Sequence, residues 1–428
     1  MRASRLLLVC ATLGSVIPAR AQSTEPPRRD DYVFVFDPQL GMEGGVRSFE
    51  SLMRVVYRYE EALPVVVNLD EGALSEKLLG ILGRAAKLTF IDWPIASLGS
   101  TAIHELFGHG ARGREFGIEP APSFALPFPY CDLLTRGDAA TCTAFSGVDE
   151  TSGLRDRDLL VTLGGLESNY LTAWWLNARI TRAGGWVRHS DLLTYGASKL
   201  VYADTFFDPD LKSARAHDPW DDVGDYVTLL QDRFNRVSAR ERATIARRLQ
   251  TAYLWNLADP TLVYAVYGTL VESLYHGRRS SRLFVPSVGG THFYPVPRFN
   301  LSPFGAEHYL DVFVSRGGAL LDVYARIGSS GLASYTGGGA RWLGLSLPNG
   351  LDLGGELDVW KQPESLPDER AVYTRRDVYG CNAGVFSQLA VVDGLGLTGK
   401  LAYKTSGYLM GQPIHAGPYG YVGVTLRP

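Results

Sequence analysis

The sequence has no marked excess of charge of either sign. It holds 42 lysines and arginines against 45 aspartates and glutamates, which gives a net charge of -3 over 428 residues. Proteins that bind nucleic acid or other polyanions usually carry a basic excess, so this balance offers no support for that class of partner. The chain also lacks a repeat of solenoid length, which argues against an architecture of stacked repeats.

Cysteine is scarce, with four in the whole chain and no C-x-x-C pair that would indicate a cysteine metal site. Cys131 and Cys142 lie at either end of a polar segment and could form a disulfide in an oxidising compartment. Cys381 would then be left over, and we expect it to be packed in a strand.

Long uninterrupted apolar runs are also rare. Residues 88–107 are apolar enough to suggest a membrane span, but they include Asp92, His104 and Glu105. Polar groups at the centre of a bilayer are costly. A buried core helix is therefore the favoured interpretation, and a membrane-embedded helix is the alternative.

The N-terminus has the pattern of a signal peptide. Arg2 and Arg5 precede an apolar stretch at 6–17, and Ala19-Arg20-Ala21 forms an A-x-A cleavage site. The apolar stretch is short for a membrane anchor that stays attached. We therefore predict that residues 1–21 are removed and that the protein is exported to the periplasm, the outer membrane or the medium.

One stretch indicates a specific chemistry. His104 and His109 flank Glu105 and an apolar run in the segment H-E-L-F-G-H. Imidazole nitrogens bind zinc, and a carboxylate beside the metal can take a proton from a zinc-bound water. The second histidine stands at i+5, not at the i+4 of H-E-x-x-H, which on a regular α-helix turns the two rings about 140° apart. A π-helical turn eased by Gly108 would align them, whereas a helix that ended at Gly108 would not.

The segment H-E-L-F-G-H-G, residues 104–110, resembles the H-E-L-L-G-H-G segment of the dipeptidyl peptidase III family of zinc peptidases. This resemblance implies that His104 and His109 bind Zn²⁺ and that Glu105 is the general base. The run that follows, residues 110–118, is similar to the sequence after H-E-x-x-H in membrane-embedded site-2 proteases. Both likenesses are confined to this short part of the chain.

A third zinc ligand is expected on a separate helix. Glu167 lies in a strongly apolar helical run, residues 156–182, directly after Gly164-Gly165 and Leu166. A glutamate there is costly unless it is paired or bound to a metal, and the glycines would let two helices approach closely. The resemblance also implies a later glutamate as ligand, although that family has a paired Glu-Glu where this chain has one glutamate. The alternatives are that Glu167 is exposed or bonded to a neighbouring helix, or that Glu150 is the ligand.

Other features near the predicted site are less specific. The proline-rich residues 117–153 predict a long loop that could shape substrate access. The acidic, aromatic stretch at 204–225 could hold a cation, but it is more typical of a solvated loop that ends in a helix N-cap. Tyr170, His189 and His217 are candidates for the group that stabilises an oxyanion.

The hydrophobic periodicity changes once along the chain. After a leader at 22–45 with a strand candidate at 32–36, apolar residues recur at helical spacing over 46–280. Over 284–428, glycine is frequent and apolar residues alternate with others between turn signals. The sequence thus predicts an α+β fold, in which an all-α domain with the zinc site precedes an antiparallel β-meander of about six to eight strands.

The predicted meander forms either a barrel or a sandwich. Strands near ten residues with tight turns resemble the hairpins of outer-membrane β-barrels, although the chain ends in Leu426-Arg427-Pro428 without a terminal aromatic residue. A soluble sandwich, or a sheet packed on the helices, would give the same pattern. Membrane association is the favoured alternative.

Two functions are consistent with these features. The first is an exported zinc-dependent hydrolase, most simply a peptidase acting on a peptide or protein substrate. His104, His109 and Glu167 would hold Zn²⁺, and Glu105 would take a proton from the attacking water. The second is a non-enzymatic outer-membrane or surface β protein in which the histidine pair forms a structural metal site.

Overall fold

In a computed structural model of the chain, the structure describes residues 31–62, 74–119, 155–200, 203–212, 222–234, 238–329, 334–347, 350–364 and 376–426. The predicted signal peptide, the predicted Cys131–Cys142 disulfide and most of the predicted access loop lie outside these ranges. Within the described residues, no helix has both the length and the apolar character needed to cross a membrane.

Helices make up the first half of the described chain. The early helices are α2 (Met42–Ala62), α3 (Leu74–Lys87), η1 (Leu88–Asp92), α4 (Trp93–Ala102), η2 (Ile103–His109) and α5 (Gly110–Glu115). The later helices are α7 (Arg155–Arg182), α8 (His189–Leu200), α9 (Ala203–Phe207), η4 (Pro209–Lys212), α10 (Asp222–Arg233), α11 (Ala239–Tyr253), η5 (Leu254–Ala258), α12 (Pro260–Tyr267) and η6 (Gly268–Tyr275). Three of these segments, η1, η2 and η6, have π-helical hydrogen bonding.

Strands follow the helices and form one large antiparallel sheet. The sheet contains β4 (Ser287–Val288), β5 (Thr291–Ser302), β6 (Gly305–Arg316), β7 (Ala319–Ser329), β8 (Ser334–Ser346), β9 (Leu351–Pro363), β10 (Asp377–Val392), β11 (Leu395–Lys404) and β12 (Gly417–Leu426). These strands are neighbours in chain order, so the predicted meander is confirmed. A separate small sheet pairs β2 (Trp186–Arg188) with β3 (Ser280–Arg282).

The strand predicted at 32–36 is also confirmed, and it completes the large sheet. This strand, β1 (Tyr32–Phe36), pairs antiparallel with β12, so the first and last described strands lie side by side. The sheet is open, with β1 and β4 at its two edges. The predicted closure into a barrel is therefore wrong, and the overall class is α+β.

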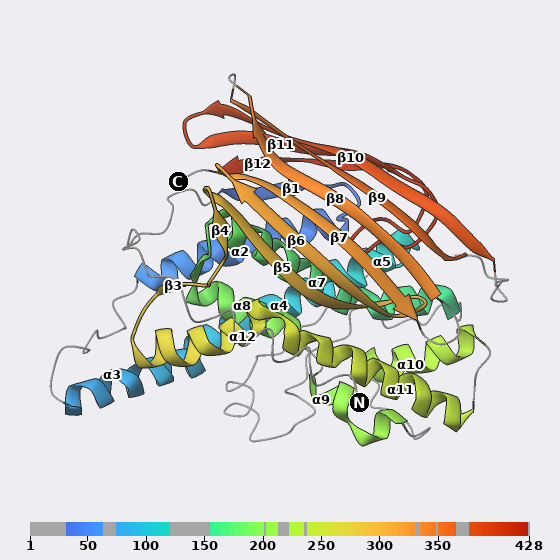
Figure 1. The fold of residues 1–428 in the computed structure, drawn as a ribbon, viewed down its shortest axis with the longest axis horizontal. Coiled ribbons are helices and arrows are strands. Elements are labelled where there is room, and N and C mark those ends of the chain that lie inside the picture. Colours follow the sequence, from blue (N-terminus) through green and yellow to red (C-terminus); the bar gives the residue numbers. More distant parts are fainter. Residues whose placement is uncertain are drawn as a thin grey trace.

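The sheet lies as one layer over the helices (Figure 1). Helix α7 is central, because it packs against η2, α2, α8 and α10 and also against β5, β6 and β7. Its apolar residues Leu163 and Leu166 belong to the same buried cluster as Phe299 and Leu301 of β5. A helical layer, not a second sheet, thus covers the inner face of the large sheet, so the predicted sandwich is also wrong.

Candidate metal centre

Helix η2 brings the two histidines of the predicted site together. Its π-helical hydrogen bonding widens the turn, which compensates for the extra residue between His104 and His109. The two imidazole Nε2 atoms lie 3.0 Å apart, and the ring centroids lie 4.7 Å apart in an edge-to-face arrangement. The predicted π-helical turn is confirmed, and the alternative of a helix ending at Gly108 is wrong because α5 continues from Gly110.

The third group at this point is an aspartate in the first turn of α10. Asp222 places Oδ2 2.9 Å from Nε2 of His104 and 3.1 Å from Nε2 of His109. Two ring nitrogens and one carboxylate oxygen therefore form a nearly equilateral triangle. Tetrahedral zinc with ligands at about 2.0–2.2 Å would hold such atoms about 3.3 Å apart, so the triangle needs to expand by only a few tenths of an ångström.

A backbone carbonyl oxygen determines which nitrogen of the His109 ring carries the proton in the neutral form. Nδ1 of His109 donates a hydrogen bond of 2.7 Å to the carbonyl oxygen of Val161 on α7. In a neutral imidazole the other nitrogen, Nε2, then carries a lone pair that points at His104 and Asp222. Histidines that bind metals are usually oriented by such a bond to a carbonyl oxygen.

The ring of His104 has a different partner. The amide nitrogen of Asn169 on α7 lies 3.2 Å from Nδ1 of His104, and Oδ1 of Asn169 has no hydrogen-bond partner among the described residues. If the amide turned by half a rotation, Oδ1 would accept a proton from Nδ1. The lone pair on Nε2 of His104 would then face the same point as that of His109.

Glu105 lies next to this triangle and is buried with it. Its Oε1 atom is 3.8 Å from Nε2 of His104, and 2% of the residue is exposed. A carboxylate in this position is too far to share the proton of the imidazole directly. It is close enough to accept a hydrogen bond from a water molecule that binds beside His104.

Glycines set the distance between η2 and α7. A Cβ atom on Gly108 would lie 2.5 Å from Cα of Gly165, and a Cβ atom on Gly164 would lie 2.7 Å from the carbonyl oxygen of Gly108. A Cβ atom on Gly165 would collide with the imidazole ring of His104. The predicted close approach of the two helices at Gly164-Gly165 is therefore confirmed.

The charges of the triangle depend on one another. Burial opposes the charged form of Asp222, but the two histidines outweigh it and hold the pKa of the carboxyl far below its usual range. Burial likewise disfavours a charged imidazole, yet Asp222 and Glu105 raise the pKa of His109 to about 10. Without a metal, the site therefore holds a proton between Asp222 and His109 at neutral pH, and a bound cation would replace that proton.

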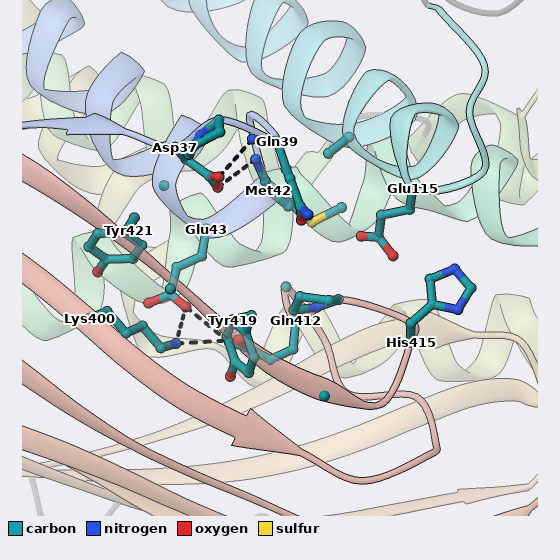
Figure 2. Close-up of a pocket in the computed structure, with 18 of the residues that line it drawn as sticks. Asp37, Gln39, Met42, Glu43, Glu115, Lys400, Gln412, His415, Tyr419 and Tyr421 are labelled. Carbon is teal, nitrogen blue, oxygen red and sulfur yellow. Dashed lines mark hydrogen bonds and ion pairs between the residues drawn. The ribbon is translucent and has the colours of Figure 1, made fainter.

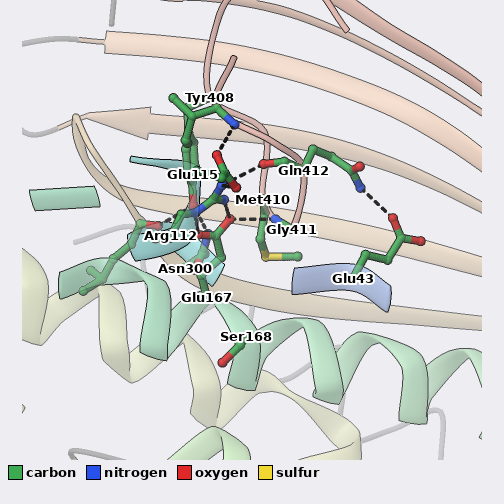
Figure 3. A network of polar contacts seen from close by, with 12 residues as sticks. Glu43, Arg112, Glu115, Glu167, Ser168, Asn300, Tyr408, Met410, Gly411 and Gln412 are labelled. Carbon is green, nitrogen blue, oxygen red and sulfur yellow. Dashed lines mark hydrogen bonds and ion pairs between the residues drawn. The ribbon is translucent and has the colours of Figure 1, made fainter. Parts of the chain in front are cut away.

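Glu167 does not belong to this cluster, so its prediction as a zinc ligand is wrong. Its Oε2 accepts a hydrogen bond of 3.0 Å from Nε of Arg112, and its Oε1 accepts one from Nη2 of Arg112 and one of 2.6 Å from the amide of Gly411. Arg112 also donates to Glu115 and to the carbonyl oxygen of Gln412 (Figure 3). Glu167 thus ties α5 and α7 to the segment between β11 and β12.

The remaining sequence candidates have other surroundings. Tyr170 is fully buried, with its ring against Phe299 and Lys199. His189 is half-buried, and this desolvation, with a contribution from Lys87, lowers its pKa to about 4. The cluster of metal-capable groups contains neither residue. His217 and Glu150 lie outside the described residues.

Nothing in the sequence distinguishes Asp222 from its acidic neighbours. It belongs to the stretch at 204–225, whose composition is typical of a solvated loop, whereas α10 begins at Asp222 itself. The one available signal was the density of acidic residues after His217, in the run His-Asp-Pro-Trp-Asp-Asp. The position of Asp222 opposite η2 depends on the packing of α10 against α7, which no local pattern encodes.

A separate cavity of about 650 Å³ lies between α2, α5 and the segment that joins β11 to β12 (Figure 2). Nζ of Lys400 donates to Oε2 of Glu43 at 2.5 Å, and Nε2 of Gln412 donates to the same oxygen at 3.0 Å. None of the three residues of the histidine–aspartate triangle lines this cavity. The cavity and the candidate metal centre are therefore distinct features, and the charged pair on the cavity wall belongs to the cavity alone.

Comparisons of the chain with protein-family models, with curated proteins and with solved structures found no match. The likeness of residues 104–110 to a zinc peptidase segment therefore remains a local one. The chemistry of the site rests on the geometry of His104, His109, Asp222 and Glu105.

Proposed function

We propose that the protein is a zinc-dependent hydrolase in which His104, His109 and Asp222 bind the ion and Glu105 is the general base. One observation carries this proposal: two imidazole Nε2 atoms and one carboxylate oxygen converge within 3.1 Å of one another. Hydrogen bonds alone suit this triangle poorly, because each proton lies between only two of the three atoms. A single cation would interact with all three at once.

The number of protein ligands favours catalysis over a purely structural role. Structural zinc sites usually have four protein ligands, whereas catalytic sites have three and keep one position for water or substrate. His104, His109 and Asp222 supply three within the described residues, and the carboxylate of Glu105 stands beside them. Zinc in such a site lowers the pKa of a bound water to about 7.

The roles of the side chains follow from their positions. Glu105 accepts the proton of the attacking water and passes it to the leaving group, a contribution of about 10²–10⁴-fold in rate. The bond from His109 to the carbonyl of Val161 keeps the imidazole in the orientation that the ion requires. A peptide or protein is the proposed substrate, because the resemblance of residues 104–110 is to a peptidase family.

Metal analysis of the purified mature protein tests the site. We expect about one zinc ion per chain, and loss of that ion when His104 and His109 are both replaced by alanine. If the wild-type protein binds no zinc after equilibration with zinc and removal of excess, the metal site is wrong.

Glu105→Gln tests the chemistry separately. The amide keeps the shape of the side chain but cannot accept the proton, so the variant should keep its zinc and lose at least about 100-fold in the cleavage of a peptide library. Glu119→Gln, the same change at an exposed position beyond α5, should leave both properties unchanged. Equal cleavage by Glu105→Gln and wild type would refute the role of Glu105.

The alternative function remains a structural metal site in a non-enzymatic outer-membrane or surface protein. It predicts zinc in the wild-type protein, no cleavage of any peptide or ester, and a lower melting temperature on removal of zinc. Glu105→Gln would then change neither the metal content nor any activity.

A further inference from the structure

The large sheet has two chemically opposite faces, and the apolar one points away from the protein. On β7, Leu321, Val323 and Ile327 are exposed, and Ile327 reaches 61%. Asp322 and Arg326, on the alternate positions, are buried against the helical layer. This arrangement is the reverse of an ordinary soluble sheet, in which the apolar face is buried and the polar face meets water.

The same inversion recurs on the neighbouring strands. Exposed aliphatic side chains on outward positions are Leu310, Leu357, Val359, Val385, Leu389, Leu397, Leu401 and Val422. Buried charged side chains on inward positions are Glu307, Asp311, Glu356, Asp358, Lys400 and Lys404. The pattern therefore belongs to the whole sheet and not to one irregular strand.

The inward charges are paired with an opposite charge or hydrogen-bonded to neutral groups, as Lys404 is to two backbone carbonyl oxygens. Arg298 binds both carboxylate oxygens of Asp311 at 2.8 and 2.9 Å, and Lys400 lies 2.8 Å from the carboxylate of Glu356. Buried charges are tolerated when they are paired and hydrogen-bonded in this way. The charged side chains of the inner face therefore find their partners within the protein. The polar face of the sheet can stay buried against the helices, and the apolar face stays outside.

Charged residues mark the two ends of the outer face. Lys361 and Asp377 form an exposed ion pair of 2.8 Å at one end, and Arg316 lies at the other end of β6. Between these ends, the outward positions of β6 to β12 carry no aspartate, glutamate, lysine or arginine. Seven strands about 4.8 Å apart, with about seven consecutive residues of each strand between these ends, give an apolar area of roughly 800 Å², which exceeds the largest patch on a typical soluble monomer.

Aromatic residues stand near the margins of this uncharged band. Tyr379 is 78% exposed and pairs in register with Lys361 at the charged end. Trp342 on β8 pairs with Gly355, six residues along β9 from Lys361, and so lies towards the opposite end. Tyrosine and tryptophan are enriched where hydrocarbon meets headgroups, because one part of each ring system is apolar and another part binds water.

We propose that hydrocarbon chains of a lipid bilayer cover the outward face of β6 to β12, with Lys361, Asp377 and Tyr379 at the level of the headgroups. The uncharged band is about 23 Å long, close to the apolar band of about 25 Å on membrane sheets. A protein partner would form about one hydrogen bond per 100–200 Å². The aliphatic, glycine and alanine side chains of this band offer few donors or acceptors for such bonds.

The test is flotation of the full chain with vesicles of phosphatidylcholine, whose headgroups carry no net charge. We expect the wild-type protein to float with the vesicles and to stay bound in 1 M salt, which shortens the range of surface electrostatics to about 3 Å. Val323→Glu, Leu357→Glu and Leu401→Glu together should lower the ratio of bound to free protein at least about 100-fold. Each charge in the apolar layer is costly.

A matched variant controls for added charge. Arg240→Glu with Arg247→Gln on the exposed surface of α11 lowers the net charge by the same three units outside the band, so it should float like the wild-type protein. Circular dichroism verifies that each variant is folded. The proposal fails if the wild-type protein stays in solution. A wild-type protein that does not float but forms a dimer, which the triple variant abolishes, would make the face a contact between two copies.

A second measurement needs no substitution in the band. Cys381 is an exposed thiol on the outward face of β10 and can carry an environment-sensitive dye. Vesicles with brominated acyl chains should quench the dye, and Cys381→Ser, treated identically, gives the background from other cysteines. Absence of quenching on bound protein would overturn the proposed orientation of the sheet. The result does not depend on the metal centre.

Discussion

Two carboxylates near the contact between η2 and α7, the fully buried Glu167 and the partly exposed Asp222, have different partners. Glu167 faces the guanidinium of Arg112 and a backbone amide, groups that bring their own protons. Asp222 faces the imidazoles of His104 and His109 at nearly equal distances. The first arrangement is complete as it stands, whereas the second leaves a point at which three possible ligand atoms converge. A buried acid therefore indicates a metal only when its neighbours are also acceptors.

The largest expected effect is on the stability that Glu167 provides. Glu167→Gln would leave the buried guanidinium of Arg112 without its full counter-charge, at a cost of about 3–5 kcal/mol in the free energy of unfolding. The folded fraction should keep its zinc. Denaturant unfolding and metal analysis of the same sample measure the two properties. Loss of zinc from folded Glu167→Gln protein would show that Glu167 also supports the metal site.

Asp222→Asn should weaken zinc binding strongly and change the stability less than Glu167→Gln does. The change removes the anionic ligand and should lower the affinity for zinc more than about 100-fold, beyond the 10–100-fold that outer partners of ligands usually contribute. The free energy of unfolding of the metal-free protein should change less than in Glu167→Gln, because the side chain of Asp222 is partly exposed. Competition with a chelator measures the affinity, and unchanged affinity would remove Asp222 from the site.

Gly165→Ala tests whether the close contact of α7 with η2 positions the metal ligand His104. A methyl group at Gly165 collides with the ring of His104, so it should displace that ligand and lower zinc affinity about 10–100-fold. Gly196→Ala on α8 is the control, because a methyl group there meets nothing within 4 Å. The control should gain about 0.5–1 kcal/mol of stability and keep its zinc. If both variants bind zinc equally, the contact at Gly165 does not position His104.

The smallest expected effect is the dependence of zinc affinity on pH. The pKa of His109 is raised to about 10, so below that pH the metal-free site holds a proton that zinc must displace. The apparent affinity should therefore rise about tenfold for each pH unit between pH 7 and 9, or about 1.4 kcal/mol per unit. In Asp222→Asn the main cause of the raised pKa is gone, so this rise should flatten. A flat profile in the wild type would contradict the shared proton.

Local patterns predicted the parts of the site that lie close together in the chain. The spacing of His104 and His109 required a π-helical turn, and the structure has one. Gly164 and Gly165 indicated a close helix contact, which they form with Gly108. These features depend on helical geometry over a few residues, so the sequence alone is sufficient to predict them.

The error at Glu167 has a physical origin. A buried glutamate can be stabilised by a metal or by a cation, and the apolar run around it does not distinguish these cases. Arg112 stands four residues after Gly108 and thus on the same side of the continuous helix formed by η2 and α5. Gly164 of α7 contacts both residues. Asp222 could be identified only from the packing of α10 on α7. Alternation predicted the strands in the same way, but it did not reveal which face of the sheet is buried.

The pairing of β1 with β12 has a consequence for the order in which the fold forms. During translation β1 leaves the ribosome early, and its partner β12 follows only after almost all of the described chain. Contacts between such distant segments form slowly, because a very long loop must close before they contribute any energy. The helices and the strands β5 to β11 can assemble progressively, whereas the pairing of β1 must wait for β12. Two strands separated by almost the whole of the described chain are therefore joined last.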